Sequence, residues 1–334
     1  MPPKFLRSGV LLRLLVLAAL IALSLYVFEK RNVVSLPQKP SRLLPKEFYR
    51  QISPLTYKYL LNQPDLCNNR NPFLVLMIPV SMRDSDSRTA IRKTWGQPNL
   101  VPHVDIARVF FVGKPGQHDP QLEEDFKKEG MTHGDIVQMD FLDTYHNLTI
   151  KTMMIMNWVA NFCRSADYAM KIDADIFLNV PYLVHYLQTK PKHNYITGSV
   201  ITDGRPRRDP NSKWHLSEEL YPDNAFPPYV SGAGYVFSVD LAKKISMASK
   251  FVRPIPLEDV YVGLCLHFLG IQPEFAWTLM PYRNLFEVYR LHYDRCTFAK
   301  RIIVTGFTPK NLMDIWTDFK SAATSCYFSS LVMH

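Results

Sequence analysis

Two aspartates stand one residue apart, directly after a short run of apolar residues. Asp173 and Asp175 follow the segment Tyr168–Ile172, whose composition predicts a buried β-strand. On an extended chain, residues i and i+2 point to the same side, so both carboxylates can face one ion. Mn²⁺ and Mg²⁺ prefer oxygen ligands and often bridge to substrate phosphates. The pair therefore predicts a metal site for a phosphorylated substrate, although a lone Asp-x-Asp also occurs in solvated turns.

A second acidic pair precedes another apolar run. Glu258 and Asp259 open the segment Val260–Leu269, which we expect to be helical. Carboxylates in the first turn of a helix lie at the positive end of its dipole. An ionised Asp259 could accept a proton from a substrate hydroxyl there. It could also serve as the helix N-cap, and the two roles are compatible.

Two arginines recur at helical spacing in the segment Ser85–Trp95. Arg88 and Arg92 are four residues apart and therefore share one face of the expected helix. Paired guanidinium groups suit phosphate or carboxylate recognition. A solvated face or a salt bridge to the rest of the body is the alternative, and without further support it is the preferred one.

The segment 143–151 leads into a long predicted helix, Leu148–Phe162. Asp143 or Asn147 could cap this helix, and Lys151 lies one turn inside it. Asn147 also begins the chain's one N-glycosylation sequon, which can be used only if the body is luminal. Capping is the plain interpretation of this segment.

Small and aromatic residues form two further candidate groups. We expect the segment Tyr229–Ser238 to be a glycine-containing turn that feeds an apolar strand. Its Gly232 and Gly234 would let the backbone approach a ligand closely, or would simply mark a tight turn or bulge. Trp214, Tyr221 and Tyr229 are candidates for stacking on sugar faces, although such residues more often belong to a core.

The composition limits the class of protein. The chain has 334 residues, is 47% hydrophobic and carries a net charge of +9. Residues 1–31 account for +4 of that charge, and no basic stripe with interleaved aromatic residues follows. Nucleic acid is therefore a poor partner for this chain, whereas an anionic substrate suits its mildly basic body.

The N-terminal region predicts a membrane anchor. Residues 10–28 are apolar except for Arg13 and Ser24, and as a helix they would span roughly 28 Å. The basic residues before this segment place residues 1–9 in the cytosol and the body in the lumen. A cleaved signal peptide is the less favoured alternative. Residues 29–66 contain five prolines and predict an extended stem, with one short helix over 48–61.

The body, residues 67–334, predicts a doubly wound α/β fold. Apolar strands are expected over 73–80, 107–113, 136–139 and 168–172, and they alternate with helices over 85–95, 121–129 and 148–162. In such folds, ligands bind beyond the carboxyl ends of the strands, where the first aspartate pair lies.

Taken in order, these segments resemble a family. The segments that carry the resemblance are Arg88–Trp95, Phe110–Gly113, Asp143–Lys151, Lys171–Phe177, Tyr229–Ser238 and Glu258–Gly263. It resembles the Golgi β-1,3-glycosyltransferase family that includes the β-1,3-galactosyltransferases and the β-1,3-N-acetylglucosaminyltransferases. The sequence around Thr-Ile-Lys-Thr-Met resembles the β-1,3-galactosyltransferases more than the other members of this family.

The resemblance implies a GT-A fold with a mostly parallel sheet, UDP-galactose as donor, Mn²⁺ or Mg²⁺ as cofactor and type II Golgi membrane topology. It assigns metal binding to Asp173 and Asp175 and the general base to Asp259. Four residues of this chain match positions where the family has charged side chains that bind the donor or stabilise the fold, namely Arg88, Arg92, Lys151 and Lys171. We expect the acceptor near another four, namely Trp214, Gly232, Gly234 and Glu258. A homodimer or a complex with another transferase is also expected.

Five cysteines in a luminal chain predict disulfides with one thiol left over. We expect the pairs Cys67–Cys163 and Cys296–Cys326. The chain has Val230 where the family usually has a cysteine, and this departure leaves Cys265 without that partner.

A second departure concerns the metal. Thr305 stands where many members of the family have a histidine, so metal affinity could be weaker unless His292 compensates. Three alternatives to galactosyl transfer remain at this stage. They are N-acetylglucosaminyl transfer on the same scaffold, a catalytically silent luminal protein that binds glycans or a partner transferase, and a metal-independent glycosidase that uses two carboxylates.

Overall fold

The computed structural model describes residues 57–68, 70–280 and 293–321. The expected cytoplasmic tail, the anchor over 10–28 and most of the stem lie outside these ranges. No helix within the described ranges is long and apolar enough to cross a membrane.

Strands and helices alternate through the first half of the body, as expected. The strands are β1 Tyr59–Leu61, β2 Leu74–Pro79, β3 Ile106–Lys114, β4 Ile136–Leu142, β5 Tyr168–Ile172, β6 Ile176–Leu178, β7 Ile196–Ile201, β8 Tyr229–Ser238, β9 Glu274–Phe275 and β10 Ile303–Thr305. The helices are α2 Ser85–Lys93, α3 Pro120–His133, α4 Leu148–Phe162, α5 Val180–Leu187, α6 Asp240–Ala248, α7 Glu258–Leu269, α9 Arg295–Ala299 and α10 Pro309–Ser321, with 3₁₀ turns η2 Tyr145–Asn147 and η3 Trp277–Leu279. The predicted bounds of α4 and β5 are confirmed.

Within the described residues, eight strands form one mixed sheet in the order β1-β4-β3-β2-β5-β8-β7-β9. Strands β4, β3, β2 and β5 are parallel, whereas β8 is antiparallel to both of its neighbours. The doubly wound prediction therefore holds for the parallel part alone. The strand order reverses between β2 and β5, and such a switch point opens a crevice at the carboxyl ends of the strands.

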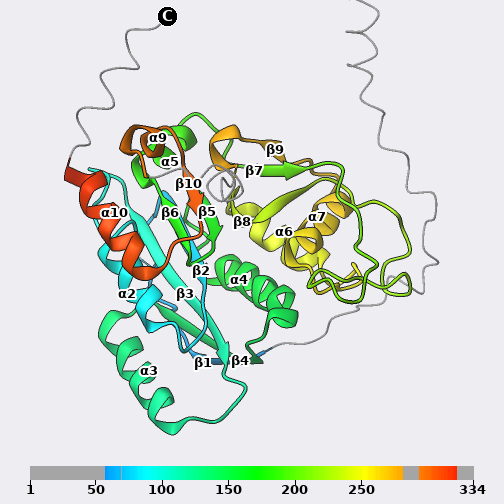
Figure 1. Ribbon diagram of the computed structural model, residues 1–334, viewed down its shortest axis with the longest axis horizontal. Helices are drawn as coiled ribbons and strands as arrows, with labels where there is room; N and C mark the ends of the chain where they lie inside the picture. Colours follow the sequence, from blue (N-terminus) through cyan, green and yellow to red (C-terminus); the bar gives the residue numbers. More distant parts are fainter. Residues whose placement is uncertain (1–56, 69, 281–292, 322–334) are drawn as a thin grey trace, which may run out of the picture. The chain divides into compact units, whose positions relative to one another are not determined.

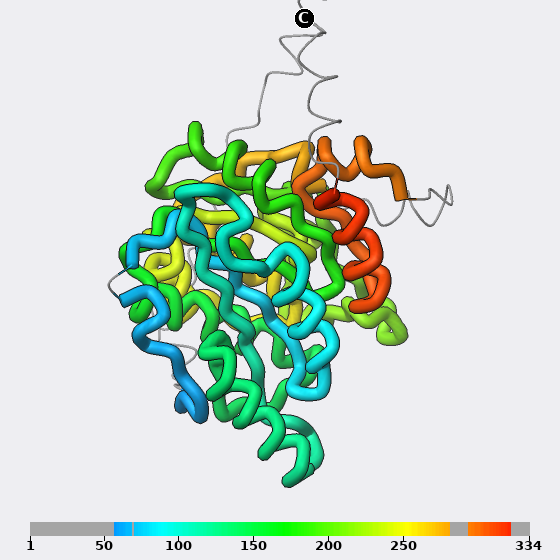
Figure 2. The backbone as a smooth tube through the Cα atoms, turned by 90° about the vertical axis from the view of Figure 1, so that its left-hand side faces the viewer, coloured from blue at the N-terminus to red at the C-terminus, as the bar shows by residue number. Residues whose placement is uncertain are grey.

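Helices cover both faces of this sheet (Figures 1 and 2). One core joins the sheet to α4, α6 and α7 through buried residues such as Trp158, Leu241 and Tyr261. The other core joins it to α2, α3, α5 and α10 through Ile91, Phe126 and other buried residues. Burial on both faces explains why β2 is a continuous apolar run without alternation.

Two local predictions are wrong. The described part of the expected helix over 48–61 contains strand β1, which pairs antiparallel with β4, so the sheet begins inside the expected stem. The segment Tyr229–Ser238 is not a turn that feeds a strand but one long strand, β8, between β5 and β7. A three-residue strand such as β1 is specified by its sheet partner, and its own sequence carries little signal.

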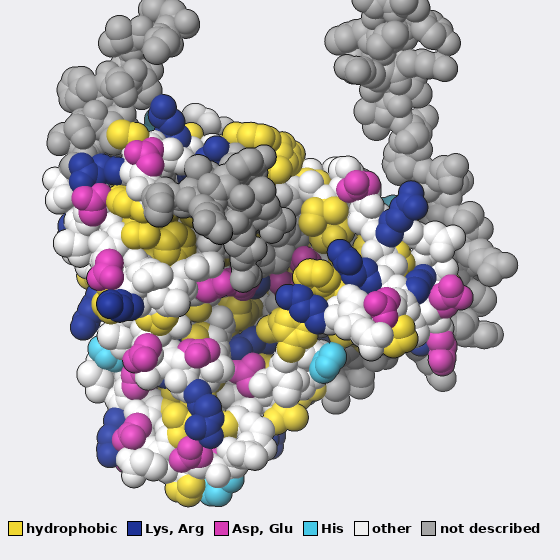
Figure 3. Space-filling model, in the orientation of Figure 1, with side chains coloured by type: hydrophobic (Ala, Val, Ile, Leu, Met, Phe, Trp, Pro, Cys, Tyr) yellow, Lys and Arg dark blue, Asp and Glu magenta, His cyan; other side chains and the backbone are white. Residues whose placement is uncertain are grey.

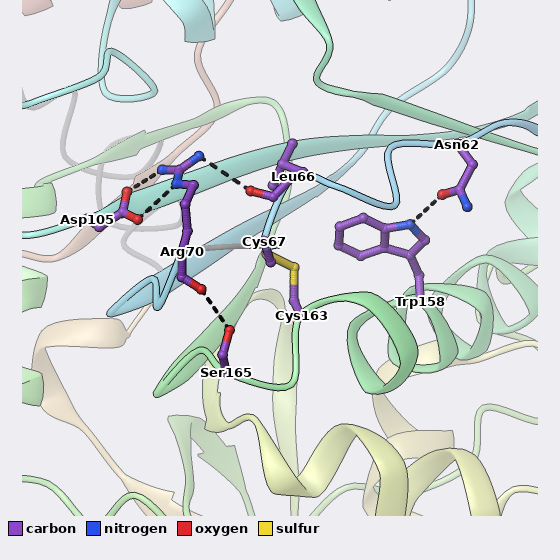
Figure 4. Close-up of a disulfide and its surroundings, with 8 residues drawn as sticks. All are labelled: Asn62, Leu66, Cys67, Arg70, Asp105, Trp158, Cys163 and Ser165. Atoms are coloured by element: carbon purple, nitrogen blue, oxygen red, sulfur yellow. Dashed lines mark hydrogen bonds and ion pairs between the residues drawn. A yellow bond between two sulfur atoms is a disulfide. The ribbon is translucent and has the colours of Figure 1, made fainter.

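The disulfide prediction is confirmed for Cys67 and Cys163, which tie the segment before β2 to the end of α4 (Figure 4). Nearby, the Trp158 indole donates a hydrogen bond to the Asn62 side chain at 2.7 Å. Cys265 is a buried free thiol, as expected. Cys296 is disulfide-bonded, and its predicted partner, Cys326, lies outside the described residues.

Candidate active site

A buried lysine joins three elements at the carboxyl end of β5. The Lys171 ammonium donates hydrogen bonds to Asp173 Oδ1 at 2.7 Å, to Glu258 Oε1 at 3.0 Å and to the carbonyl oxygen of Gly232. These partners come from the turn after β5, from α7 and from β8. The structure thus brings both acidic pairs of the sequence to one place, next to the switch point of the sheet.

Burial and charge oppose each other in this cluster. Burial disfavours the charged form of Lys171, but Asp173 and Glu258 outweigh that effect and raise the pKa of the lysine. Burial also raises the pKa of Glu258 to about 7, although the Lys171 charge works in the other direction. The second oxygen of Glu258 accepts a hydrogen bond from the Thr152 hydroxyl at 3.1 Å.

Asp259 lies beside this cluster in the first turn of α7. Its Oδ1 accepts a hydrogen bond from its neighbour's N–H, that of Val260, at 2.8 Å, and its Oδ2 accepts one from Gly232 N at 3.2 Å. Burial raises the pKa of Asp259, while these two hydrogen bonds lower it. The N-cap position belongs to Leu257, so the capping role considered for Asp259 is wrong. A carboxylate with a raised pKa is a stronger base than an ordinary one.

Backbone geometry explains Gly232. Between the pairs Val200–Val230 and Gly198–Tyr235, residues 231–234 of β8 bulge opposite a single residue of β7. A Cβ on Gly232 would lie 2.7 Å from Glu258 Oε1, which is closer than real contacts allow. A Cβ on Gly234 would meet nothing nearer than 3.4 Å. The bulge interpretation is therefore the right one, and Gly232 is the glycine that permits the close approach of β8 and α7.

Asp173 and Asp175 occupy the turn between β5 and β6 rather than an extended strand, so the strand-alternation argument does not apply to them. Asp173 is half-buried, and its N–H donates to Ala233 O at 3.1 Å. The Asp175 side chain is exposed, and its carbonyl oxygen accepts hydrogen bonds from Gly306 and Phe307 at 2.9 Å. Pairing of β10 with β6 thereby brings Thr305 next to this turn.

The turn provides the oxygen ligands that a divalent cation needs. Within the described ranges, no three histidine, cysteine, aspartate or glutamate side chains are placed so that they could hold a metal ion by themselves. A nucleotide-bound Mg²⁺ or Mn²⁺ usually needs only one or two carboxylates, because substrate phosphates complete the shell. The buried Thr305 hydroxyl also lacks a partner among the described residues and is one more oxygen near Asp175. These residues fit a cation held jointly with a diphosphate; His292 lies outside the described ranges.

Arg88 and Arg92 lie elsewhere, in a salt-bridge network between α2, α3 and the start of β4. Arg88 pairs with Glu129 at 2.6 Å, and Arg92 pairs with Glu129 at 2.6 Å and with Asp135 at 2.7 Å. Arg108 adds a third cation on Asp135 at 2.6 Å. The structure does not bring Arg88 and Arg92 to the Lys171 cluster, and their contacts are those of the salt-bridge alternative.

Lys151 is also engaged internally. Its buried ammonium donates to Val80 O at 2.8 Å and to both carboxylate oxygens of Asp143 at 2.8 Å. Burial is the largest influence on this lysine and lowers its pKa. Lys151 thus joins α4 to the ends of β2 and β4. Asn147 does not cap α4 with its side chain, which donates instead to Leu142 O at 2.8 Å.

Trp214, in the connection between β7 and β8, interacts with Tyr145, a residue that lies within electrostatic reach of Asp259, Glu258 and Asp173. Trp214 is 41% exposed, whereas Tyr221 is buried and belongs to the core. Figure 3 shows acidic side chains near the middle of this face, with hydrophobic and basic side chains beside them toward α6 and α7. The exposed ring of Trp214 can therefore contact a sugar, whereas the buried ring of Tyr221 cannot.

Sequence reasoning missed two tyrosines. Tyr145 is 47% exposed, and burial of part of its ring raises its pKa, with further contributions from Asp259, Glu258 and Asp173. Tyr235 pairs with Lys171 across β5 and β8, and its fully buried hydroxyl has no partner among the described residues. Only strand register reveals Tyr235, since a tyrosine in a strand ordinarily indicates a core position.

The described residues thus form a mixed α/β fold whose parallel part carries carboxylates at its switch point, and helix α7 adds a second acidic pair beside them. Residues 86–275 match the family model described as Galactosyltransferase. The chain is 42% identical over 276 residues to beta-1,3-galactosyltransferase 1 of Mus musculus, covering 81% of each chain. It is 40% identical over 263 residues to beta-1,3-galactosyltransferase 2 of Homo sapiens, covering 78% of this chain and 61% of that one. The chain belongs to the galactosyltransferase family, and it is an enzyme of the glycosyltransferase class.

Solved structures with a related arrangement include the bifunctional glycosyltransferase WbbM, at a TM-score of 0.42 and 9% identity, covering 78% of this chain and 52% of that one. The galactosyltransferase LgtC in complex with donor and acceptor sugar analogues has a TM-score of 0.40 at 9% identity and covers 73% of this chain and 95% of its own. Similarities at this level carry no information on mechanism.

Proposed function

We propose that this enzyme transfers galactose from UDP-galactose to the 3-hydroxyl of an acceptor sugar and forms a β linkage with inversion. The family and the printed names of the relatives support the sugar and the linkage. The single observation that supports the mechanism is the position of Asp259, a carboxylate of raised pKa that shares Gly232 with the Lys171–Asp173–Glu258 cluster.

The reaction is a single displacement. The acceptor O3 attacks the anomeric carbon, a C–O bond forms, and the bond between that carbon and the diphosphate oxygen breaks with its electron pair leaving on UDP. Asp259 takes the proton of the attacking hydroxyl. One displacement inverts one centre, so an α-linked donor gives a β-linked product. Holding acceptor and donor in line supplies much of the rate.

Asp173 and Asp175 would hold the divalent cation. When bound, the cation offsets the charge that develops on the departing diphosphate. Lys171 keeps Asp173 oriented through the 2.7 Å ion pair and leaves the other carboxylate oxygen available. The same lysine anchors Gly232 and therefore the backbone N–H that orients Asp259.

Replacement of the base tests this mechanism. Asp259→Asn should lower kcat at least about a thousandfold, because the amide cannot accept the proton, while UDP binding by calorimetry stays within about twofold. Asp125→Asn, a change of an exposed aspartate on α3, serves as the matched control. Turnover in Asp259→Asn comparable to that of the control would refute the base assignment.

Metal dependence is a separate proposal. Transfer should stop in EDTA and recover on addition of Mn²⁺ or Mg²⁺, and Asp175→Asn should shift the activating Mn²⁺ concentration upward by about tenfold or more. Undiminished transfer in EDTA would exclude a metal-assisted departure, whereas hydrolysis without metal would point to the glycosidase alternative.

Two alternatives remain for the same site. A panel of UDP-sugars with common acceptors separates galactosyl from N-acetylglucosaminyl transfer by relative kcat/KM. A silent glycan-binding protein is the second alternative, motivated by Thr305 and Val230 at positions where the family usually has histidine and cysteine. Absence of UDP release with every donor and acceptor would favour it.

A luminal location in the Golgi with type II topology remains a proposal as well. It is supported by the Cys67–Cys163 disulfide, because such bonds persist in oxidising compartments. In sealed microsomes, the body should resist added protease, and glycosidase treatment should increase its mobility if Asn147 carries a glycan. Light scattering of the purified protein tests the expected homodimer.

A further inference from the structure

The connection between β7 and β8 presents an aromatic ring with two cations against it. The Arg207 guanidinium carbon lies 4.9 Å from the centroid of the Trp214 ring, and Lys213 Nζ lies 4.5 Å from it. All three side chains are exposed. Cations over an indole face are attracted by its electron density, and the ring therefore holds both charges near one another.

Hydrogen bonds within the loop hold the backbone that carries Arg207 and Trp214. The neighbouring Arg208 points the other way, and its guanidinium donates to Leu216 O at 2.7 Å and Tyr221 O at 2.8 Å. The Leu216 N–H in turn donates to Arg207 O at 2.9 Å. The backbone under Arg207 and Trp214 is thus fixed before any ligand arrives, which lowers the entropic cost of binding.

The loop lies next to the candidate base. The Tyr229 ring packs so closely on the loop that a Cβ on Gly204 would lie 2.7 Å from its Cε1. The other side of Tyr229 contacts α7, where a Cβ on Gly263 would lie 2.5 Å from Tyr229 Cβ. Burial raises the pKa of Tyr229 to about 12, with Asp259 adding to this effect and Arg207 opposing it. Arg207 and Asp259 therefore act on the same ring.

Neither cation is neutralised internally. In the part of the chain that the structure describes, no carboxylate forms an ion pair with Arg207 or Lys213. The other arginines named above (88, 92, 108 and 208) all have carboxylate or carbonyl partners. Two unpaired charges at the edge of a substrate site therefore remain available for an anionic group of the ligand.

We propose that Arg207, Lys213 and Trp214 form an acceptor subsite that selects an acidic oligosaccharide, one whose sugar next to the galactose-accepting residue carries a carboxylate or a sulfate. This inference rests on the proposed function, because it takes Asp259 as the group that faces the acceptor hydroxyl. Trp214 contacts the apolar face or edge of that neighbouring sugar, and the two cations contact its negative group. Exposed ion pairs of this kind contribute about a threefold preference each, and salt weakens them.

The test compares one acceptor in three forms, neutral, carboxylated and sulfated, with the full-length chain purified in detergent and UDP-galactose as donor. The wild type should show a kcat/KM about tenfold higher for an acidic form than for the neutral form, mostly through KM, and this preference should shrink in high salt. The double variant Arg207→Ala/Lys213→Ala should lose the preference and keep its activity on the neutral acceptor. Arg207→Lys, which preserves the charge, should retain most of it.

Arg205→Ala is the matched control, because it removes an exposed arginine from the same loop and should leave the preference intact. The acidic form with the higher kcat/KM shows whether the subsite recognises a carboxylate or a sulfate. Equal kcat/KM for the neutral and acidic forms in the wild type overturns the subsite while the proposed transferase stands. Failure to transfer galactose to any of the three forms counts instead against the proposed function.

Discussion

At the scale of single residues, the site is organised by one lysine rather than by the aspartates that first attract notice. Lys171 is buried, yet three oxygen partners from separate elements keep it charged. The carboxylate of Glu258 pairs with this charge. Because the pKa of Glu258 is about 7, both of its protonation states are populated near neutral pH. The charge of this pair is therefore sensitive to pH near neutrality.

Glu258 should make stability depend on pH. Its folded-state pKa of about 7 exceeds the ordinary value of 4.5, so the folded protein holds the proton more tightly than the unfolded chain. The free energy of unfolding should therefore fall as pH rises from about 4.5 to about 7. The raised pKa of Lys171 adds no slope there, because its contribution is complete below 10.5. Glu258→Gln should flatten this decline in denaturant titrations from pH 4.5 to 8; an unchanged slope would contradict the assignment.

At the scale of elements, the position of α7 against the β8 bulge decides where the second acidic pair points. Helix α7 begins at Glu258, so both carboxylates lie in its first turn, and the bulge brings the Gly232 backbone against them. In the parallel half, salt bridges join α2 to α3 and to Asp135, the residue before β4.

Gly232→Ala should disrupt the α7–β8 contact, because its Cβ would lie 2.7 Å from Glu258 Oε1. We expect a loss of about 1–3 kcal/mol in the free energy of unfolding and at least a tenfold fall in kcat. Gly234→Ala is the control, since its nearest neighbour at 3.4 Å is the flexible end of Met170. Equal effects of the two substitutions would show that the close approach does not matter.

Arg88→Ala separates a structural role from donor binding. Arg88 is 1% exposed and pairs with Glu129, so its removal should cost about 3 kcal/mol of stability by leaving that carboxylate short of a partner. Thermal unfolding and the KM for the donor should be measured together. A large rise in KM at unchanged stability would instead support the donor-binding role first expected for this arginine.

At the scale of the whole molecule, one disulfide joins distant parts of the described chain. Cys67 and Cys163 are 96 residues apart, and their bond closes a loop that contains β2, β3, β4 and α4. The bond therefore constrains most of the parallel half, in which the switch point lies.

Removing this bond should destabilise the protein through the unfolded state. The variant Cys67→Ala/Cys163→Ala should lose about 2–5 kcal/mol of unfolding free energy, because a long loop regains its freedom when the chain unfolds. Equilibrium unfolding of the variant and the wild type, with and without reductant, measures this. Reductant should lower the stability of the wild type more than that of the variant, because the disulfide of Cys296 is present in both proteins and only the wild type also has the Cys67–Cys163 bond. A variant as stable as the wild type would mean that the cross-link adds nothing.

The sequence by itself determined the parallel half of the fold and the identity of the acidic residues. Strands β2, β3 and β5 and helix α4 are strongly apolar segments whose pattern depends on burial alone, and the motifs in their order are enough to indicate the family. The tertiary structure alone decided which charges meet. Lys171 and Glu258 are 87 positions apart, and Arg92 and Asp135 are 43 apart, so only packing could place the first pair in the site and the second outside it. Strand β1, the position of β8 between β5 and β7, and the loop that carries Trp214 escaped prediction for the same reason. Their conformations follow from partners distant in the chain, and local sequence carries little information about contacts of that kind.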